Sequence, residues 1–442
     1  MNPEFERNLY LEFSVARLIG MPAFLLVIFF FTYLIDDKNF DEVTANSALG
    51  LYIAIVLFWG AKQAAESIFD ELRNNTWDIQ KTSAISPWSL AWGKLFGSTI
   101  YMWYGGLLCL FIYAVATPEP EHVFLTLVYS LGCGLLAQSL SLLVSLFSLR
   151  RKQSFNTGFS YLFVLFALFF IMPIMLNVDD MRNEGMTWYG VGFDVAYFGA
   201  ITLILACLWT IVGIYRLLSE ELRIRTLPWV WLLFIFFLIF YLTGAINLEE
   251  HEQEHGHGLF MIWLMISFCV CVTSSYLLAF IDDNNPMLAR KLWIYSEQEQ
   301  WLRMFQELPC WIISVVLALP TAVIFTLLFP MEQVEEVYPY PIVIYLLMLR
   351  DIGILLFFSY APNPKRALGL TLLYMICLYG LLPAIFHAMD AEFIAGIILP
   401  IFSDNVLLAI IFASVQTTLI GFLLFQRWQG RLADVRKQNR EY

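Results

Sequence analysis

The chain has 442 residues, of which 60% are hydrophobic and 14% are charged, and its formal net charge at pH 7 is −12. A soluble protein of this length carries roughly a quarter charged residues, so much of the apolar surface here must face lipid. The negative net charge argues against nucleic acid as a partner. The composition therefore predicts an all-α, polytopic integral membrane protein embedded in the lipid bilayer.

Apolar runs of about 20 residues, the length that crosses a bilayer as a helix, recur along the whole chain. Twelve transmembrane helices are predicted, at residues 19–35, 47–62, 93–116, 123–147, 157–176, 193–217, 228–247, 258–281, 309–329, 341–360, 366–388 and 396–426. The last run is interrupted by Pro400 and by Asp404–Asn405. This interruption favours a short re-entrant piece followed by a full span.

The basic residues give this topology an orientation. With the N-terminus in the cytoplasm, all of the 25 Lys and Arg residues except Lys38 and Arg182 fall in cytoplasmic segments. A wrong number of spans would scramble the alternation, because each missed helix inverts every later loop. The positive-inside rule thus predicts that both termini are cytoplasmic, which places the protein in the cell (inner) membrane.

The first 18 residues are too polar to span the membrane but are patterned. Phe5, Leu9 and Phe13 lie four residues apart, and charged residues occupy the other faces. This spacing predicts an amphipathic helix over residues 1–18 that lies along the inner membrane interface before the chain turns in at Pro22.

The segment after the second span, residues 63–92, is too polar for membrane and too patterned for a linker. Its features, in chain order, are a helix that continues through Glu71 and Arg73, a break at Asn74–Asn75, a short segment around Trp77 and a restart at Ser86-Pro87-Trp88. A short helix held across the ends of two spans can pass force from a soluble partner into the membrane.

This arrangement resembles the permease subunit of ATP-binding-cassette (ABC) transporters of the type-2 exporter class. In that family an Asn-Pro-led amphipathic helix precedes the first span, and the second span continues into a loop that docks in a cleft of the ATPase subunit. The residues that carry the resemblance are Glu71-Leu72-Arg73, Thr76-Trp77, Ser86-Pro87 and Gly93-Lys94. The chain departs from the family by reading Asn74–Asn75 where a glycine is frequent, and Ser86 precedes Pro87 rather than following it.

The resemblance implies a set of ATPase-coupling residues and a division of labour between subunits. The coupling residues are Glu71, Arg73, Thr76, Trp77, Pro87, Trp88 and Lys94. ATP and Mg are expected on a separate ABC ATPase subunit, with no cofactor in this chain. No G-x-x-x-x-G-K-[ST] phosphate-binding loop occurs in the sequence, and no catalytic set such as H-E-x-x-H is present, so the chain is not expected to be an enzyme.

The C-terminal part of the sequence weakly echoes the N-terminal part. Asn285-Pro286 followed by Arg290 mirrors Asn2-Pro3 followed by Arg7. The pattern favours an internal duplication with six-span regions at 19–225 and 226–442, and a second coupling-like loop at 350–366 that contains Arg350 and Asp351. Whether the assembly holds one permease copy or two stays open.

Two further groups of polar residues have alternative interpretations. Gln138, Ser141 and Ser145 form a polar stripe in one span, which could face a substrate path or pack against another helix. His251, His255 and His257 lie among carboxylates in a predicted outer loop. They are weak candidates for metal ligands, and a solvated connection is the simpler interpretation, so no metal site is predicted.

Three hypotheses for the function follow. The first is the permease of an ATP-driven transporter, in which an exporter is the expected direction. The second is a twelve-span secondary transporter driven by an ion gradient, which requires buried carboxylates and helices interrupted in mid-membrane. The candidate carboxylates Asp194, Asp351 and Asp404 are all predicted near helix ends, which disfavours it. The third, a membrane-embedded enzyme, requires clustered polar residues at one membrane face, and the sequence shows none.

Overall fold

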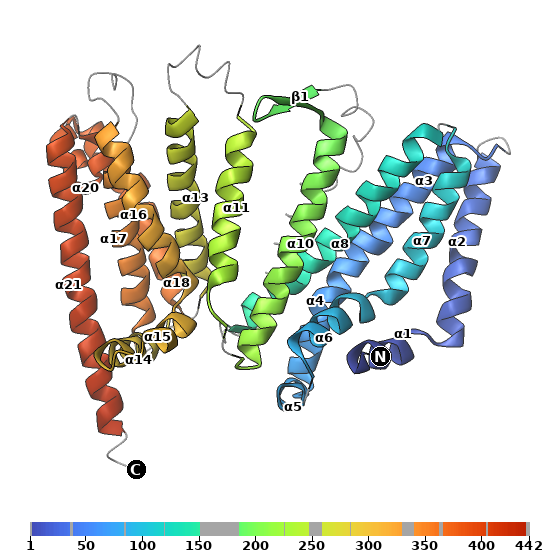
Figure 1. The fold of residues 1–442 in the computed structure, drawn as a ribbon, viewed down its shortest axis with the longest axis horizontal. Helices are drawn as coiled ribbons and strands as arrows, with labels where there is room; N and C mark the ends of the chain where they lie inside the picture. Colours follow the sequence, from blue (N-terminus) through green and yellow to red (C-terminus); the bar gives the residue numbers. More distant parts are fainter. Residues whose placement is uncertain are drawn as a thin grey trace. The chain divides into compact units, whose positions relative to one another are not determined.

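The protein is described here from a computed structural model, which covers residues 2–35, 39–83, 85–118, 120–150, 185–224, 226–246, 259–282, 284–328, 340–361, 366–403 and 405–438. The chain divides into two compact units, unit 1 at Met1–Thr226 and unit 2 at Leu227–Tyr442. Both are built from helices, as Figure 1 shows. The all-α membrane fold expected from the composition is confirmed.

Unit 1 consists of helices and one hairpin. Its elements are α1 (Pro3–Glu12), α2 (Val15–Ile35), α3 (Glu42–Tyr52), the π-helical η1 (Ile53–Trp59), α4 (Gly60–Arg73), α5 (Trp77–Thr82), α6 (Pro87–Trp92), the π-helical η2 (Gly93–Gly97), α7 (Ile100–Ala116), α8 (Pro120–Arg150), β1 (Gly185–Trp188), β2 (Val191–Asp194) and α10 (Val195–Glu221). The antiparallel hairpin β1–β2 leads directly into α10, whose first turn is capped by Asp194. Asp194 therefore lies at a helix end, as predicted.

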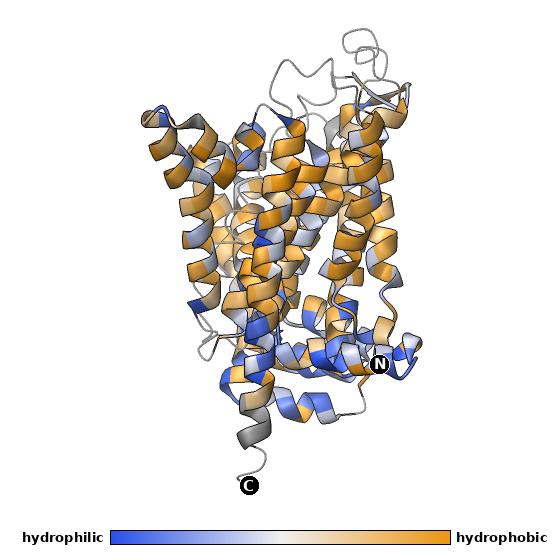
Figure 2. Ribbon diagram, turned by 90° about the vertical axis from the view of Figure 1, so that its left-hand side faces the viewer, coloured by the Kyte–Doolittle hydropathy of each residue, from blue (hydrophilic) through white to orange (hydrophobic). Residues whose placement is uncertain are grey.

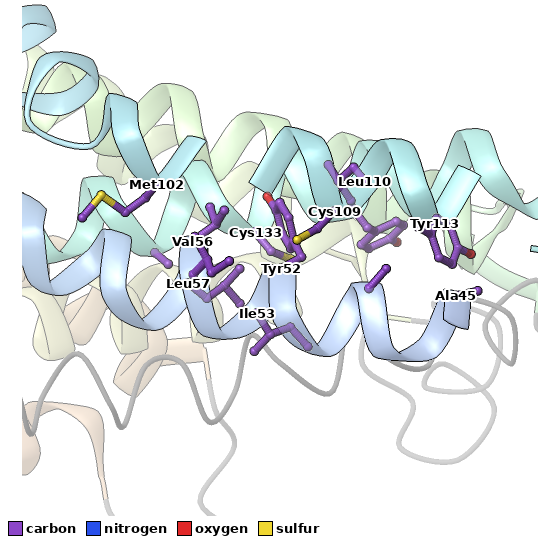
Figure 3. Close-up of a cluster of buried hydrophobic side chains, with 14 of the residues drawn as sticks. Ala45, Tyr52, Ile53, Val56, Leu57, Met102, Cys109, Leu110, Tyr113 and Cys133 are labelled. Carbon is purple, nitrogen blue, oxygen red and sulfur yellow. The ribbon is translucent and has the colours of Figure 1, made fainter. Parts of the chain in front are cut away.

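The core of unit 1 lies where α3 and η1 pack between α7 and α8. Figure 3 shows the Tyr52 ring beside Cys109 of α7 and Cys133 of α8, in a cluster that also contains Val56. The buried Tyr52 hydroxyl donates a hydrogen bond to the carbonyl oxygen of Ser130 at 2.7 Å. A buried hydroxyl needs such a partner in an apolar interior. The contact fixes the register of these helices, and with it the position of α4, which continues from η1.

The N-terminal helix is shorter than the 1–18 segment predicted. It ends at Glu12, and α2 begins at Val15, so Pro22 lies inside α2 rather than at the turn. The physical reason is local: the Ser14 hydroxyl accepts the Arg17 N–H at 3.3 Å and caps the start of α2. In Figure 2 the hydrophilic colour gathers around the marked N-terminus, whereas the spans are mainly hydrophobic.

Unit 2 is helical throughout its described residues. Its elements are α11 (Trp229–Gly244), α13 (Leu259–Ile281), α14 (Pro286–Glu297), α15 (Trp301–Glu307), α16 (Cys310–Leu328), α17 (Pro341–Ser359), α18 (Ala367–Ile376), the π-helical η6 (Cys377–Leu381), α19 (Leu382–Ala388), α20 (Glu392–Ile398), the 3-10 turn η7 (Pro400–Phe402) and α21 (Val406–Gln438). The buried core joins α11, α13, α16 and α17, and α17 also packs against α21. Helix α17 is thus enclosed on several sides.

Eleven of the twelve predicted spans fall on described helices, and the remaining one, 157–176, lies outside the described residues. Within the described ranges, nine helices are long and apolar enough to cross a membrane, and the pair Pro87–Gly97 and Ile100–Ala116, bent by 51°, makes a tenth. Helix α11 is apolar but has only 16 residues. The total of twelve therefore stays a prediction.

The end of the chain contains the interruption that the sequence predicted. The short helix α20 and the turn η7 precede the long helix α21, in place of one continuous helix over 396–426. Asp404, one of the candidate carboxylates, lies outside the described residues. The interruption places the backbone of residues 397–398 beside α21, where the Gln416 side chain bonds to both carbonyl oxygens.

Candidate functional site

Helix α1 packs across the start of the third span, against η2. Asn2 caps α1 and also donates from its side-chain nitrogen to the Ser89 carbonyl oxygen at 2.6 Å. The Asn8 side chain donates to the Gly93 carbonyl oxygen at 3.2 Å. A side chain at Gly93 is excluded, because its Cβ would lie 2.5 Å from Cγ of Glu4. The missing side chain allows α1 to approach the η2 backbone closely.

A network of charged and polar side chains, all buried except the 45% exposed Arg7, lies between α1 and the helices that it contacts. The Glu71 carboxylate of α4 accepts from Lys94 Nζ at 2.5 Å on one oxygen, and from the Arg7 guanidinium at 2.7 Å and the Gln80 amide at 2.5 Å on the other. Glu4 also bonds to Arg7, at 2.7 Å, and lies 3.8 Å from Lys94. The network therefore joins α1, α4, α5 and η2.

Three members of the network, Lys94, Glu4 and Glu71, are almost inaccessible to solvent. Lys94 is 1% exposed, Glu4 3% and Glu71 7%. Charges at such depth are costly to desolvate, and removing one partner leaves another buried and uncompensated. Two carboxylates face one ammonium and one guanidinium, so the charges balance. The four elements should consequently move as one body.

Helix α5 is anchored to the same body through Trp77. The Trp77 ring is buried between two amines, with Lys94 Nζ 5.4 Å and Lys81 Nζ 5.6 Å from its centroid. Lys81 also forms an ion pair with Glu221 at 2.8 Å, at the end of α10. Cation–π contacts of this kind favour a fixed ring position. Force applied to α5 would thus reach both α4 and α10.

The turn between α4 and α5 is a left-handed cap at Asn75, whose φ is 56°. The Thr76 N–H bonds to the Glu71 carbonyl oxygen at 2.9 Å, and the Asn75 N–H bonds to that of Leu72 at 3.2 Å. This is the Schellman pattern, in which glycine is usual and asparagine is tolerated. The predicted continuation of α4 through Arg73 and the break at Asn74–Asn75 are both confirmed.

Asn75 offers a test of this turn. Replacing it by glycine should leave the free energy of unfolding unchanged or slightly higher, because glycine adopts positive φ freely. Replacing it by valine should lower that free energy by about 1–2 kcal/mol, the cost of a left-handed conformation for an L-residue. Unfolding of the purified protein by SDS titration in mixed micelles measures both. Equal stability of the two variants would contradict the cap.

Exposed side chains occur at the end of α4, on α5 and at the start of α6; we call them together the α5–α6 surface and define it by Arg73, Ile79 and Trp88. Ile79 is 68% exposed and Trp88 43%. Trp88 also contacts the Tyr215 ring at 5.1 Å between centroids. The buried Pro87 occupies the first turn of α6, which Ser86 caps. Exposed aromatic and aliphatic residues at helix ends are typical of interaction surfaces.

The structure sorts the sequence-predicted residues by place. Glu71, Trp77 and Lys94 are brought together in the buried network, and Arg73 and Trp88 lie on the α5–α6 surface. Thr76 forms part of the turn, where its hydroxyl donates to the Glu71 carbonyl oxygen at 3.2 Å. Glu4, Arg7 and Gln80 were not predicted as site residues. The spacing of Glu4, Arg7 and Asn8 on one face of α1 is the pattern that could have revealed them.

The polar stripe of α8 is a helix-packing device. Gln138 is buried, donates to the Val56 carbonyl oxygen at 3.2 Å and accepts from the Trp103 indole at 2.8 Å. Ser141 donates to the Ala61 carbonyl oxygen at 2.5 Å, and Ser145 bonds within its own helix. These contacts support the packing interpretation, since each polar group is satisfied by protein. The π-helical η1 supplies the carbonyl that Gln138 reaches.

The prediction of a second coupling-like loop at 350–366 is wrong for residues 350–359, which belong to α17. Arg350 and Asp351 lie in the middle of α17 and are 2% and 1% exposed. The Asp351 carboxylate neutralises the Arg350 guanidinium at 2.9 Å, which allows the pair to be buried. Asp351 was also predicted near a helix end and is not. Residues 362–365 lie outside the described ranges.

The weak metal candidates His251, His255 and His257 lie outside the described residues. Within the described ranges, no group of three or more His, Cys, Asp or Glu side chains is arranged to hold a metal ion.

Comparison with known proteins now identifies the class. Residues 28–246 match the family model described as ABC-2 family transporter protein. The match covers Glu71, Gln80 and Lys94 of the network and begins after α1, and the resemblance noted in the sequence is confirmed. Residues 28–246 thus form an ABC-2-type permease region, the multi-pass membrane component of an ABC transporter. No curated protein and no solved structure showed significant similarity to the chain.

Proposed function

We propose that this permease exports its substrate across the cell membrane and is driven by a separate ABC ATPase that docks on the α5–α6 surface. The observation that carries the proposal is the network of Glu71, Lys94, Arg7 and Gln80, which ties α5 to α1, α4 and η2. A docking surface backed by a rigid set of helices transmits a displacement, whereas a mobile loop would absorb it.

The route of the force follows the contacts. A push on α5 reaches α4 through the hydrogen bond from Gln80 to Glu71, and reaches η2 through the ion pair from Glu71 to Lys94. From η2 the chain bends by 51° into α7, which spans the membrane. ATP binding and Mg belong to the partner in this proposal. The basic residues around α1 and α5 support a cytoplasmic location of this end, by the positive-inside rule.

Substitutions on the α5–α6 surface test the docking. Ile79→Asp and Trp88→Ala should each weaken binding of the co-expressed ATPase by about thirtyfold, the effect of a hot-spot residue worth ~2 kcal/mol. The matched control is Trp293→Ala, since Trp293 is also exposed but lies in α14 of unit 2. Pull-down of the ATPase with the full chain, together with an unfolding curve for each variant, gives the result. Undiminished ATPase binding by both folded surface variants would overturn the proposal.

A second candidate function deserves a test because of Asp351. A secondary transporter requires a buried carboxylate in an interrupted helical region, and Asp351 lies in mid-helix beside the π-helical η6. The sequence alone had put Asp351 near a helix end, which disfavoured a secondary transporter. Uptake by vesicles that contain the full chain and the ATPase separates the two: transport with ATP and no ion gradient supports the ABC permease. Transport with a gradient and no ATP supports the alternative.

A further inference from the structure

Unit 2 contains a second buried polar cluster, centred on the Arg350–Asp351 pair. The Asp351 carboxylate accepts a hydrogen bond from the Tyr276 hydroxyl at 2.8 Å and from the Tyr379 hydroxyl at 2.6 Å. Arg350 donates to the Gln416 side chain at 2.6 Å, and its guanidinium lies 5.1 Å from the centroid of the Tyr379 ring. The cluster joins α13, α17, η6 and α21, all within the membrane-spanning part of unit 2.

Tyr379 of this cluster lines two cavities. A cavity of about 370 Å³ is lined by Tyr276, Asp351 and Tyr379, and one of about 770 Å³ is also lined by Tyr379. The larger has polar groups at His387 and Ser403 and apolar ones at Phe393, Leu408 and Phe412. Its volume lies in the range of roughly 300–1,000 Å³ typical of small-molecule sites, and a mainly apolar wall with a few polar groups is the usual composition.

The chemistry of the cluster selects its ligand. The charges of Arg350 and Asp351 cancel, so the pair attracts no net charge. Each tyrosine hydroxyl donates its single hydrogen bond to Asp351, so each oxygen can act toward a ligand only as an acceptor. Donation to a carboxylate also strengthens an oxygen as an acceptor. The ligand should therefore carry a hydrogen-bond donor on an uncharged head group.

The apolar wall indicates where the ligand comes from. Phe393 and Phe412 pack edge to face at 6.0 Å between centroids. Phe393, Met389 and Leu407, around the same end of unit 2, are exposed large hydrophobic residues, as expected of residues that face lipid. An acyl chain can contact these three side chains as it enters from the bilayer.

We propose that this cavity of unit 2 is an intramembrane binding site for an uncharged, hydroxyl-bearing lipid-like molecule that enters from the bilayer, with its apolar chain against Phe393 and Phe412 and its hydroxyl on Tyr379. All residues named for this site lie beyond residue 246, where the family match ends. It requires no ATPase, so its failure and that of the proposed function are distinguishable.

The test uses the full chain in lipid vesicles and a photoreactive long-chain alcohol as the probe. We expect saturable labelling of peptides from residues 379–412, displaced by excess tetradecanol and weaker by about three- to tenfold for the matching methyl ether, which lacks the donor. Labelling that tetradecanol does not displace, or that is equal for the ether, would overturn the proposal without any variant.

Two variants localise the site. Gly396→Trp places a ring in the cavity that Gly396 lines, away from the ion pair, and should abolish displaceable labelling. Tyr379→Phe keeps the ring but removes the oxygen, and should erase the preference for the alcohol over the ether. Gly369→Trp, where nothing lies within 4 Å, is the control and should label like the unmodified protein. Undiminished labelling of a folded Gly396→Trp protein would contradict the placement.

Discussion

Replacing Lys94 by methionine should lower the free energy of unfolding by about 3–5 kcal/mol, the usual cost of removing one partner of a buried ion pair. Methionine fills a similar volume but leaves the Glu71 and Glu4 carboxylates with Arg7 as their remaining cation. Each carboxylate then stays buried with less compensation. An SDS titration of the purified chain in mixed micelles measures the loss, and stimulation of the ATPase should fall with it.

The control is a lysine of the same unit that pairs at the surface. Lys62 lies 3.8 Å from Glu66, and its side chain is 56% exposed. Lys62→Met should therefore change stability by less than about 1 kcal/mol. Combining Lys94→Met with Glu71→Met removes both charges of the pair. The double variant should be more stable than the sum of the single losses predicts, by about 0.5–3 kcal/mol. Strict additivity would show that Glu71 and Lys94 do not interact.

Gly93→Ala should detach α1 from η2. The new Cβ would lie 2.5 Å from Cγ and 2.6 Å from Cβ of Glu4, and 3.2 Å from the Phe5 backbone nitrogen. Rotation of one side chain does not relieve contacts with Cβ and backbone, so the helix must shift. Overpacking of this kind costs about 1–3 kcal/mol. The shift also draws the Glu4 carboxylate away from Lys94.

Limited trypsin digestion follows the detachment directly, because Arg7 lies within α1. The Gly93→Ala protein should be cleaved after Arg7 several times faster than the unmodified protein, since cleavage requires local opening. Gly50→Ala is the matched control: it lies in α3 with nothing within 4 Å of the added Cβ. Alanine there should raise stability by up to about 1 kcal/mol through helix propensity. Equal cleavage of the two variants would contradict the contact.

Local patterns predicted the secondary structure of residues 63–92 well. The continuation of α4, the break at Asn74–Asn75 and the restart at Ser86-Pro87 follow from capping residues that act on their own neighbours. The end of α1 was misplaced although its cause is equally local, because Ser14 was not read as a cap. The β1–β2 hairpin was also not anticipated.

The buried networks could be predicted only in part, because their members are distant in sequence. Glu71 and Lys94 were singled out through the resemblance, but Arg7 reaches Glu71 from 64 residues away. Arg350 was assigned to a loop although it lies in the middle of the predicted span 341–360, because a basic residue within the membrane is costly. Its neighbour Asp351 removes that constraint by neutralising it, and a hydropathy pattern does not report pairing.

The most direct test of the coupling account is photo-crosslinking from position 79. A benzoylphenylalanine placed at Ile79 of the full chain, co-expressed with the ATPase in native membranes, should form an adduct with the ATPase, and Lys94→Met in the same chain should reduce the change in that adduct upon addition of ATP. The same probe at Trp293 should form none. An ATPase adduct from both positions, or from neither, would contradict docking on the α5–α6 surface.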